Sequence, residues 1–226
     1  MNVCQEIAEI SSERASLYRL LATLYFKPLD NEQIEAIADC ASGEAESDES
    51  PFAEAFRDIY GALRLRHTGT REILGADFTA VFYGTKTIDE RTAMPYESLH
   101  DQSCGRFMGQ ARGEVVHILK AAGLKVPQNI DLPEDHLSFI CAYLALTCDE
   151  QERQARAGNL DELRKVSADQ NLFFEKHLQS WVPSFAKYAR RFVETRFYRG
   201  VLELTEIFVK EEDATQQDIL KALEVA

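Results

Sequence analysis

The sequence lacks any segment that would direct the chain into or across a membrane. Residues 1–26 have no basic n-region, no continuous apolar run and no small-residue cleavage site of the kind found in a secretory signal. No other stretch approaches the roughly 20 uninterrupted apolar residues of a membrane span. These absences predict a cytoplasmic protein without a membrane span.

Recognisable catalytic motifs are also missing. The chain has no P-loop, no dinucleotide-binding glycine fingerprint, no nucleophile elbow and no HExxH zinc motif. The histidines at 67, 100, 117 and 177 stand singly, which favours structural roles. A metal-dependent helical phosphohydrolase is disfavoured because Asp135-His136 has no further aligned ligands. The sequence therefore predicts no enzymatic activity, no metal and no cofactor.

Positive charge is scarce. The 25 Lys and Arg residues are outnumbered by 38 Asp and Glu residues, which gives a formal net charge of −13. Such a surface repels phosphate backbones, so we expect no nucleic-acid partner. It would favour a basic ligand or peptide, although acidic surfaces are also typical of cytoplasmic proteins that have no such ligand.

Paired cysteines are absent as well. The five cysteines are an odd number with no C-x-x-C spacing, which fits reduced thiols in the cytosol. Cys141 and Cys148 are seven residues apart, about two helical turns, so both should face the core. We expect buried, inert cysteines and no metal ligands.

Helical periodicity is present almost everywhere. From Ile7 to Tyr25 the apolar residues recur at steps of three and four, and Pro28 ends this stretch. Asp30 is placed to cap a shorter helix that runs through Cys40. Further helices are expected over 52–66, 70–83 (stopped by Gly84), 102–122, 133–157, 160–180, 183–197, 199–211 and 215–224. This pattern predicts an all-α fold, a single globular bundle of roughly ten helices spanning 1–226.

Three stretches interrupt the helical pattern. Residues 42–50 are polar and acidic and should form an exposed loop. Residues 85–100 lose the periodicity but contain Met94, Pro95, Tyr96 and Leu99, so this loop should pack against something. Two prolines in 126–133 indicate a sub-domain boundary or hinge near 125–133.

The expected helix 102–122 contains three glycines spaced by four residues, Gly105, Gly109 and Gly113. This spacing would let a neighbouring helix approach closely. A weakened helix without a special role is an equal alternative.

One compact polar group stands out, at Pro133-Glu134-Asp135-His136. A helix that begins at Pro133 would place both carboxylates and the imidazole in its first turn, where acidic side chains complement the helix dipole. The histidine is less well explained there. Asp135 and His136 could hydrogen-bond a peptide or guanidinium group, and no third ligand lies nearby to complete a metal or catalytic site.

Several segments, taken in order, together resemble the TorD/DmsD-like redox enzyme maturation chaperones, which recognise the twin-arginine leader peptides of molybdoenzymes. The likeness covers nearly the whole chain. The matching segments are 18–25, 77–82, 95–99, 133–137 and 173–185.

The resemblance implies a TorD-like helical chaperone without catalytic turnover, a monomer or a domain-swapped dimer. Its partners would be the twin-arginine leader peptide and the precursor of a molybdoenzyme catalytic subunit. Aromatic walls would hold the apolar part of the leader while Asp135 and other carboxylates attract its arginines. Carried over to this sequence, the leader-binding residues are Pro133, Asp135, His136, Tyr18, Tyr25, Phe78, Phe82, Tyr96 and Ser98.

Two departures limit the likeness. The family often has a glutamate just before the proline, where this chain has Leu132. Guanine nucleotide binding, reported for some members, is not extended to a chain without a P-loop. The alternative is a nitrate reductase-type assembly factor or another helical adaptor, and a client without a twin-arginine leader would favour it.

Overall fold

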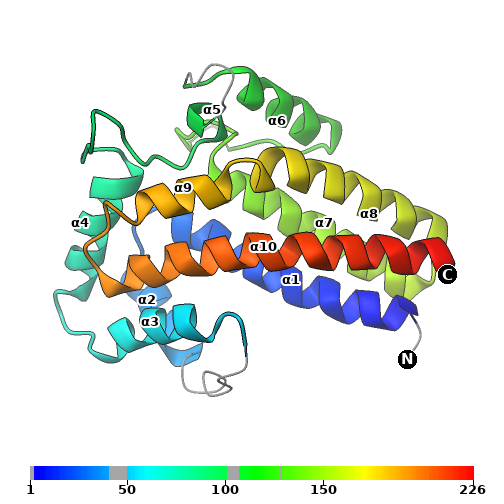
Figure 1. Cartoon of the computed structure of the whole chain (residues 1–226), viewed down its shortest axis with the longest axis horizontal. Coiled ribbons are helices and arrows are strands. Elements are labelled where there is room, and N and C mark those ends of the chain that lie inside the picture. Colours follow the sequence, from blue (N-terminus) through cyan, green and yellow to red (C-terminus); the bar gives the residue numbers. More distant parts are fainter. Residues whose placement is uncertain (1–2, 41–49, 101–106, 128) are drawn as a thin grey trace. The chain divides into compact units, whose positions relative to one another are not determined.

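Helices form all the regular structure in the part of the chain that the structure describes. The computed structural model describes residues 3–40, 50–100, 107–127 and 129–226 (Figure 1). No strand occurs in these ranges, and the two β-bridges, Ile88 with Arg91 and Tyr96 with His136, are isolated. The predicted all-α fold is confirmed. The elements are α1 (Val3–Phe26), α2 (Asn31–Cys40), α3 (Ala53–Arg64), α4 (Thr70–Phe82), α5 (Glu97–His100), α6 (Gln110–Ala121), α7 (Leu137–Ala157), α8 (Leu160–Phe174), the π-helical turn η1 (Glu175–Gln179), α9 (Val182–Ala189) and α10 (Arg196–Val225).

Local capping chemistry fixes several helix ends. The Gln33 backbone N–H donates to Asp30 Oδ1 at 2.9 Å, and the Asp30 N–H donates to Gln33 Oε1 at 3.1 Å. This reciprocal pair satisfies N–H groups that have no partner within α2. Gly84 follows α4 with φ of 69°, a conformation that glycine adopts without strain. The predicted cap at Asp30 and the stop at Gly84 are both confirmed.

The last helices differ from the prediction. Where two helices were expected over 199–211 and 215–224, α10 is continuous from Arg196 to Val225. The polar run near its middle is internal to the helix because Glu212 and Gln216 are buried and bonded to each other. Before α10, the Asp77 carboxylate accepts the backbone N–H groups of Glu194 and Thr195, so α9 cannot extend to 197.

The helix predicted over 102–122 is shorter in the structure. Residues 101–106, including Cys104 and Gly105, lie outside the described residues, as does the predicted acidic loop up to residue 49. Met108 has φ of 60° and Gly109 is an extended N-cap, so α6 begins at Gln110. A Cβ at Gly113 would have nothing within 4 Å, so the close helix approach suggested for that glycine is wrong.

Of the four cysteines in the described residues, two are buried as predicted. Cys141 and Cys148 are buried and free, and burial raises the pKa of both thiols, that of Cys148 to about 12. Cys40 is exposed and Cys4 is half-buried, so the expectation that they are buried is wrong.

The chain divides into two compact units. The first contains residues 1–23, 96–181 and 209–226, and the second contains 24–95 and 182–208. Pro127 and Pro133 both lie in the first unit, and the predicted single domain with a hinge near 125–133 stays a prediction. None of the described helices combines the length and the apolar character that crossing a membrane requires.

The first unit buries polar as well as apolar side chains. Its apolar cluster joins α1, α7, α8 and α10 through Ile7, Ala8, Ala155, Leu163, Ile219 and Leu223. One to two turns further along α1, the Arg14 guanidinium donates to both Glu212 oxygens, to Gln151 at 2.7 Å and to Gln170 at 2.6 Å. Burial alone lowers the pKa of Arg14, but the adjacent Glu212 carboxylate reverses this and raises it, so the guanidinium stays charged.

Candidate functional site

The polar segment singled out in the sequence is a turn, and the helix starts only after it. The prediction that Pro133 begins the helix is wrong, because α7 begins at Leu137 with His136 as its extended N-cap residue. His136 is held extended by its antiparallel bridge to Tyr96. The imidazole Nδ1 accepts the Ser138 backbone N–H at 3.1 Å. It also lies 2.7 Å from the Ser138 hydroxyl. The histidine therefore replaces the usual Ser, Thr or Asp cap.

Asp135 joins this turn to the short helix α5. Its Oδ2 accepts the Ser98 backbone N–H at 2.9 Å, and its backbone carbonyl accepts the Glu97 N–H at 3.1 Å. Both groups belong to the first turn of α5, whose N–H groups have no partner within the helix. The other carboxylate oxygen, Oδ1, is buried and has no hydrogen-bond partner among the described residues.

Aromatic rings close over the turn. The Tyr96 ring packs edge-on against His136 at 4.9 Å between centroids, and against Phe107 at 5.1 Å. Burial lowers the pKa of His136 to about 3, so the imidazole is neutral at physiological pH. The structure thus brings together Tyr96, Ser98, Asp135 and His136. The Asp135 and His136 side chains are 0% and 2% exposed, so they stabilise the turn from within.

The other predicted site residues lie in other places. Pro133 is buried in the same turn, and its carbonyl accepts the His136 N–H at 3.0 Å. Tyr18 lies elsewhere in the first unit, where its hydroxyl donates to Glu212 at 2.9 Å. Tyr25, Phe78 and Phe82 belong to the second unit and pack edge to face, with ring centroids 5.1 and 5.2 Å apart. These aromatics form core, and the four-residue group around Asp135 is the compact part of the predicted site.

A buried carboxylate–imidazole pair beside this group was not predicted. Both oxygens of the Glu97 carboxylate lie 3.0 Å from His177 Nδ1, and both side chains are buried. Burial raises the pKa of Glu97, and the histidine partly opposes that shift. The sequence indicated a structural role for His177 but gave no sign of a partner 80 residues away.

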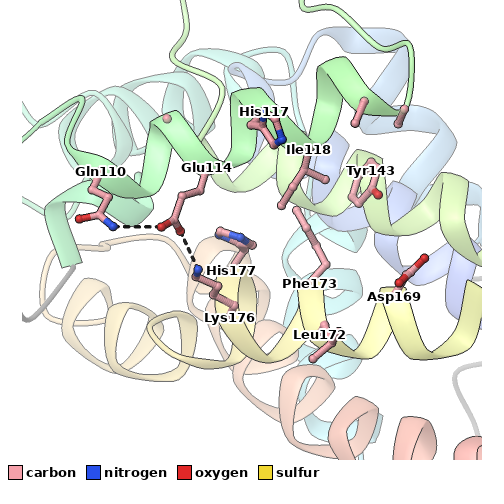
Figure 2. Close-up of a pocket in the computed structure, with 13 residues that line it drawn as sticks. Gln110, Glu114, His117, Ile118, Tyr143, Asp169, Leu172, Phe173, Lys176 and His177 are labelled. Carbon is pink, nitrogen blue, oxygen red and sulfur yellow. Dashed lines mark hydrogen bonds and ion pairs between the residues drawn. The ribbon is translucent and has the colours of Figure 1, made fainter.

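On the other side of His177 the first unit has an open groove of about 950 Å³ (Figure 2). One wall is the face of α6 formed by Gln110, Gly113, Glu114, His117, Ile118 and Ala121, followed by Ala122. The opposite wall comprises Asp169, Leu172 and Phe173 of α8 with Lys176 and His177 of η1, and Tyr143 of α7 also lines the groove. Sequence reasoning missed this groove.

The groove is apolar in its middle and polar at both ends. Figure 2 shows Ile118 and Phe173 between the two polar ends. At one end Lys176 forms an ion pair with Glu114 at 2.9 Å, and this bond lowers the pKa of the Glu114 carboxyl. At the other end Asp169 lies near Tyr143, where burial and the Asp169 charge together raise the pKa of the phenol.

Two interactions connect the groove to the Asp135 turn. The Arg112 guanidinium of α6 bonds to Glu134 at 2.7 Å, and His177 bonds to Glu97 of α5. The turn, α5 and both walls of the groove are therefore joined by bonds between polar side chains. Among the described residues no group of three His, Cys, Asp or Glu side chains could hold a metal ion. The arrangement suits binding of a partly apolar ligand.

The chain matches one protein family and is similar to several proteins of known name. Residues 45–187 match the family described as nitrate reductase delta subunit. Chaperone protein TorD of Vibrio cholerae is 27% identical over 227 residues, covering 96% of this chain and 98% of the relative. TorD of Vibrio vulnificus is 29% identical over 210 residues, covering 90% and 94%. A solved redox enzyme maturation protein from Archaeoglobus fulgidus is 19% identical, with a TM-score of 0.41 and coverage of 79% and 90%. The resemblance to TorD-like chaperones is confirmed.

Proposed function

Because the chain belongs to the nitrate reductase delta subunit family, we propose that it is a cytoplasmic assembly chaperone for a molybdenum-cofactor-containing oxidoreductase, with no catalytic turnover of its own. The observation that supports this most is the end-to-end match to TorD chaperones, which covers 96% of this chain and 98% of the relative. The chain would hold its client until the cofactor is inserted.

The proposed ligand is the twin-arginine leader of the client precursor. The region around Tyr96, Ser98, Pro133, Asp135 and His136 is the candidate for leader binding. The buried Asp135 and His136 would act by fixing the 96–98 and 133–136 segments, since their side chains are closed off from solvent. Tyr18, Tyr25, Phe78 and Phe82 would support these segments as core. The net charge of −13 favours a ligand that carries two arginines.

A second candidate is an assembly factor of the nitrate reductase type, whose client has no twin-arginine leader. The description of the matching family supports this alternative. The two candidates differ in the client and share the chaperone role.

The client itself decides between them. We would purify the tagged full-length chain from its native cell and identify the bound polypeptide by mass spectrometry. Calorimetry with a synthetic peptide of the client's N-terminus would then measure binding. A client whose leader binds supports leader recognition. A client that lacks a twin-arginine leader supports the assembly factor, and the absence of any co-purified oxidoreductase would overturn both.

A further inference from the structure

The groove between α6 and the α8–η1 segment has no assigned ligand. We propose that it binds an apolar helical segment of the client polypeptide, with a basic residue of that segment placed beside Asp169. This inference rests on the proposed chaperone function, since the occupant is part of a client. It adds a binding site distinct from the buried Asp135 turn.

Each wall of the groove is one face of a helical segment, which suits packing against a helical ligand. On α6, the groove-lining positions 110, 113, 114, 117, 118 and 121 recur at steps of three and four residues. The facing positions 169, 172, 173 and 176 follow the same steps. Each wall is thus one continuous face of a helix, and a third helix laid between two such faces presents its own residues at the same spacing.

The groove has room for such a segment. A Cβ built at Gly113 meets nothing within 4 Å, so the α6 wall is open at its middle. Leu172 projects from α8 with 64% of its surface exposed, and Ile118 on the opposite wall is only partly covered. The volume of about 950 Å³ lies at the upper end of the roughly 300–1,000 Å³ typical of ligand pockets, which accommodates several side chains.

The charges at the two ends of the groove favour one orientation of the proposed ligand. Glu114 at one end is neutralised by Lys176, whereas Asp169 at the other end is exposed and has no ion-pair partner in the described part of the chain. The free carboxylate is therefore available to a cation of the ligand. A peptide with arginines at one terminus of its apolar stretch would satisfy Asp169 while its apolar side chains cover Ile118 and Leu172.

Blocking the groove tests the proposal. The probes are the N-terminal peptide of the co-purified client and the same peptide with its arginines replaced by glutamine, titrated by calorimetry into the full-length chain. Gly113→Trp should fill the groove and weaken binding of the arginine peptide by about tenfold or more.

Control variants outside the groove show whether a loss of affinity comes from the groove or from the substitution itself. Lys120→Trp puts the same large side chain on an exposed position of α6 that does not line the groove. It should leave affinity within about twofold. Asp169→Asn should weaken the arginine peptide by about three- to tenfold and leave the glutamine peptide unchanged, whereas Glu162→Gln, on an exposed position of α8 outside the groove, should change neither.

The outcomes distinguish this inference from the proposed function. If the unaltered chain captures its client and Gly113→Trp binds the peptide equally well, the groove is not the site and the chaperone function stands. Should Gly113→Trp not fold by circular dichroism, Leu172→Ser provides the same test, and unchanged affinity overturns the inference. Concentration-dependent self-association abolished by Gly113→Trp would also overturn it, because the occupant would then be a second copy. No client and no peptide binding at all would refute the proposed function.

Discussion

A single arginine organises the polar interior of the first unit. Arg14 and Glu212 form an ion pair whose side chains are 5% and 1% exposed, and the guanidinium also reaches Gln151 and Gln170. Tyr18 donates its hydroxyl to the same carboxylate, so burial and the Glu212 charge together raise the pKa of that phenol. Removing either charge leaves the other one desolvated and unpaired, which is far more costly than removing both.

Glu212→Leu should therefore lower the free energy of unfolding by about 3–5 kcal/mol, as measured by urea denaturation followed by circular dichroism. The double variant Arg14→Met/Glu212→Leu should recover a large part of that loss. Arg19→Ala, which breaks the exposed pair with Asp149, serves as the control and should cost less than about 1 kcal/mol. A Glu212→Leu loss no larger than that of Arg19→Ala would contradict the assigned role.

Because His136 is buried in its neutral form, we expect the protein to lose stability at acid pH. Burial depresses its folded pKa to about 3, below the ordinary value of 6.5. Between these two values the unfolded chain binds a proton that the folded chain does not, so stability falls as the pH drops below 6.5. The loss in the free energy of unfolding that is due to His136 approaches about 1.4 kcal/mol per pH unit. Urea denaturation at pH 7.5 and 5.5 measures it.

His136→Asn is the matched variant for this test, because asparagine keeps a cap acceptor for the Ser138 N–H but does not titrate. Its stability should fall less between pH 7.5 and 5.5 than that of the unaltered chain. The buried Glu97, whose pKa is raised, acts in the opposite direction and is common to both proteins. Equal pH slopes would show that the imidazole is not buried in its neutral form.

At the scale of elements, alanine substitutions at two helix-interior glycines should have opposite effects on the stability of the protein. A Cβ at Gly200 of α10 would lie 2.8 Å from the Ala55 carbonyl oxygen and 2.9 Å from Asp58 Cβ, both in the second unit. Gly200→Ala should therefore destabilise the protein by about 1–3 kcal/mol. Gly113→Ala meets open space and should stabilise it by about 0.5–1 kcal/mol through helix propensity. Thermal unfolding of both variants measures the difference, and a shift of the same sign in both would contradict the packing at Gly200.

The helices that the sequence predicted best have a buried apolar face and a strong capping signal. In α1 the apolar residues recur at the helical period along the whole helix, and at the start of α2 the Asp30 cap forms as predicted. The break expected before residue 215 was wrong because Glu212 and Gln216, polar in composition, are buried partners in a long helix. The π-helical turn at Glu175–Gln179 follows α8 without any local signal that sequence periodicity could detect.

The candidate site was predictable only in part. The resemblance grouped Asp135 and His136 with Tyr96 and Ser98, which the structure brings into contact. The resemblance gave no sign that these side chains are buried, because their burial depends on contact between the segments around Ser98 and Asp135, which are 37 residues apart in the sequence. The groove escaped detection because its α6 face consists mainly of glycine, alanine and polar residues. Such a face becomes a binding surface only opposite α8, whose position no local pattern encodes.

At the scale of the whole molecule, charge governs how a basic ligand approaches. The net charge of −13 gives the chain a negative potential that extends about one Debye length, roughly 8 Å at physiological ionic strength. Such a potential raises the association rate of a cationic peptide, whereas the apolar contacts govern how slowly it leaves.

Salt should therefore weaken binding of the arginine-bearing leader peptide mainly through its association rate. Between about 50 and 500 mM NaCl we expect the association rate to fall by about tenfold, measured by stopped-flow fluorescence, with a much smaller change in the dissociation rate. The peptide with glutamine in place of its arginines is the control, and its rates should barely respond to salt. Asp169→Asn removes one of the 38 acidic residues, so it should leave the salt dependence nearly intact while speeding dissociation. A salt effect confined to the dissociation rate would mean that local ion pairs, and not the overall charge, recruit the peptide.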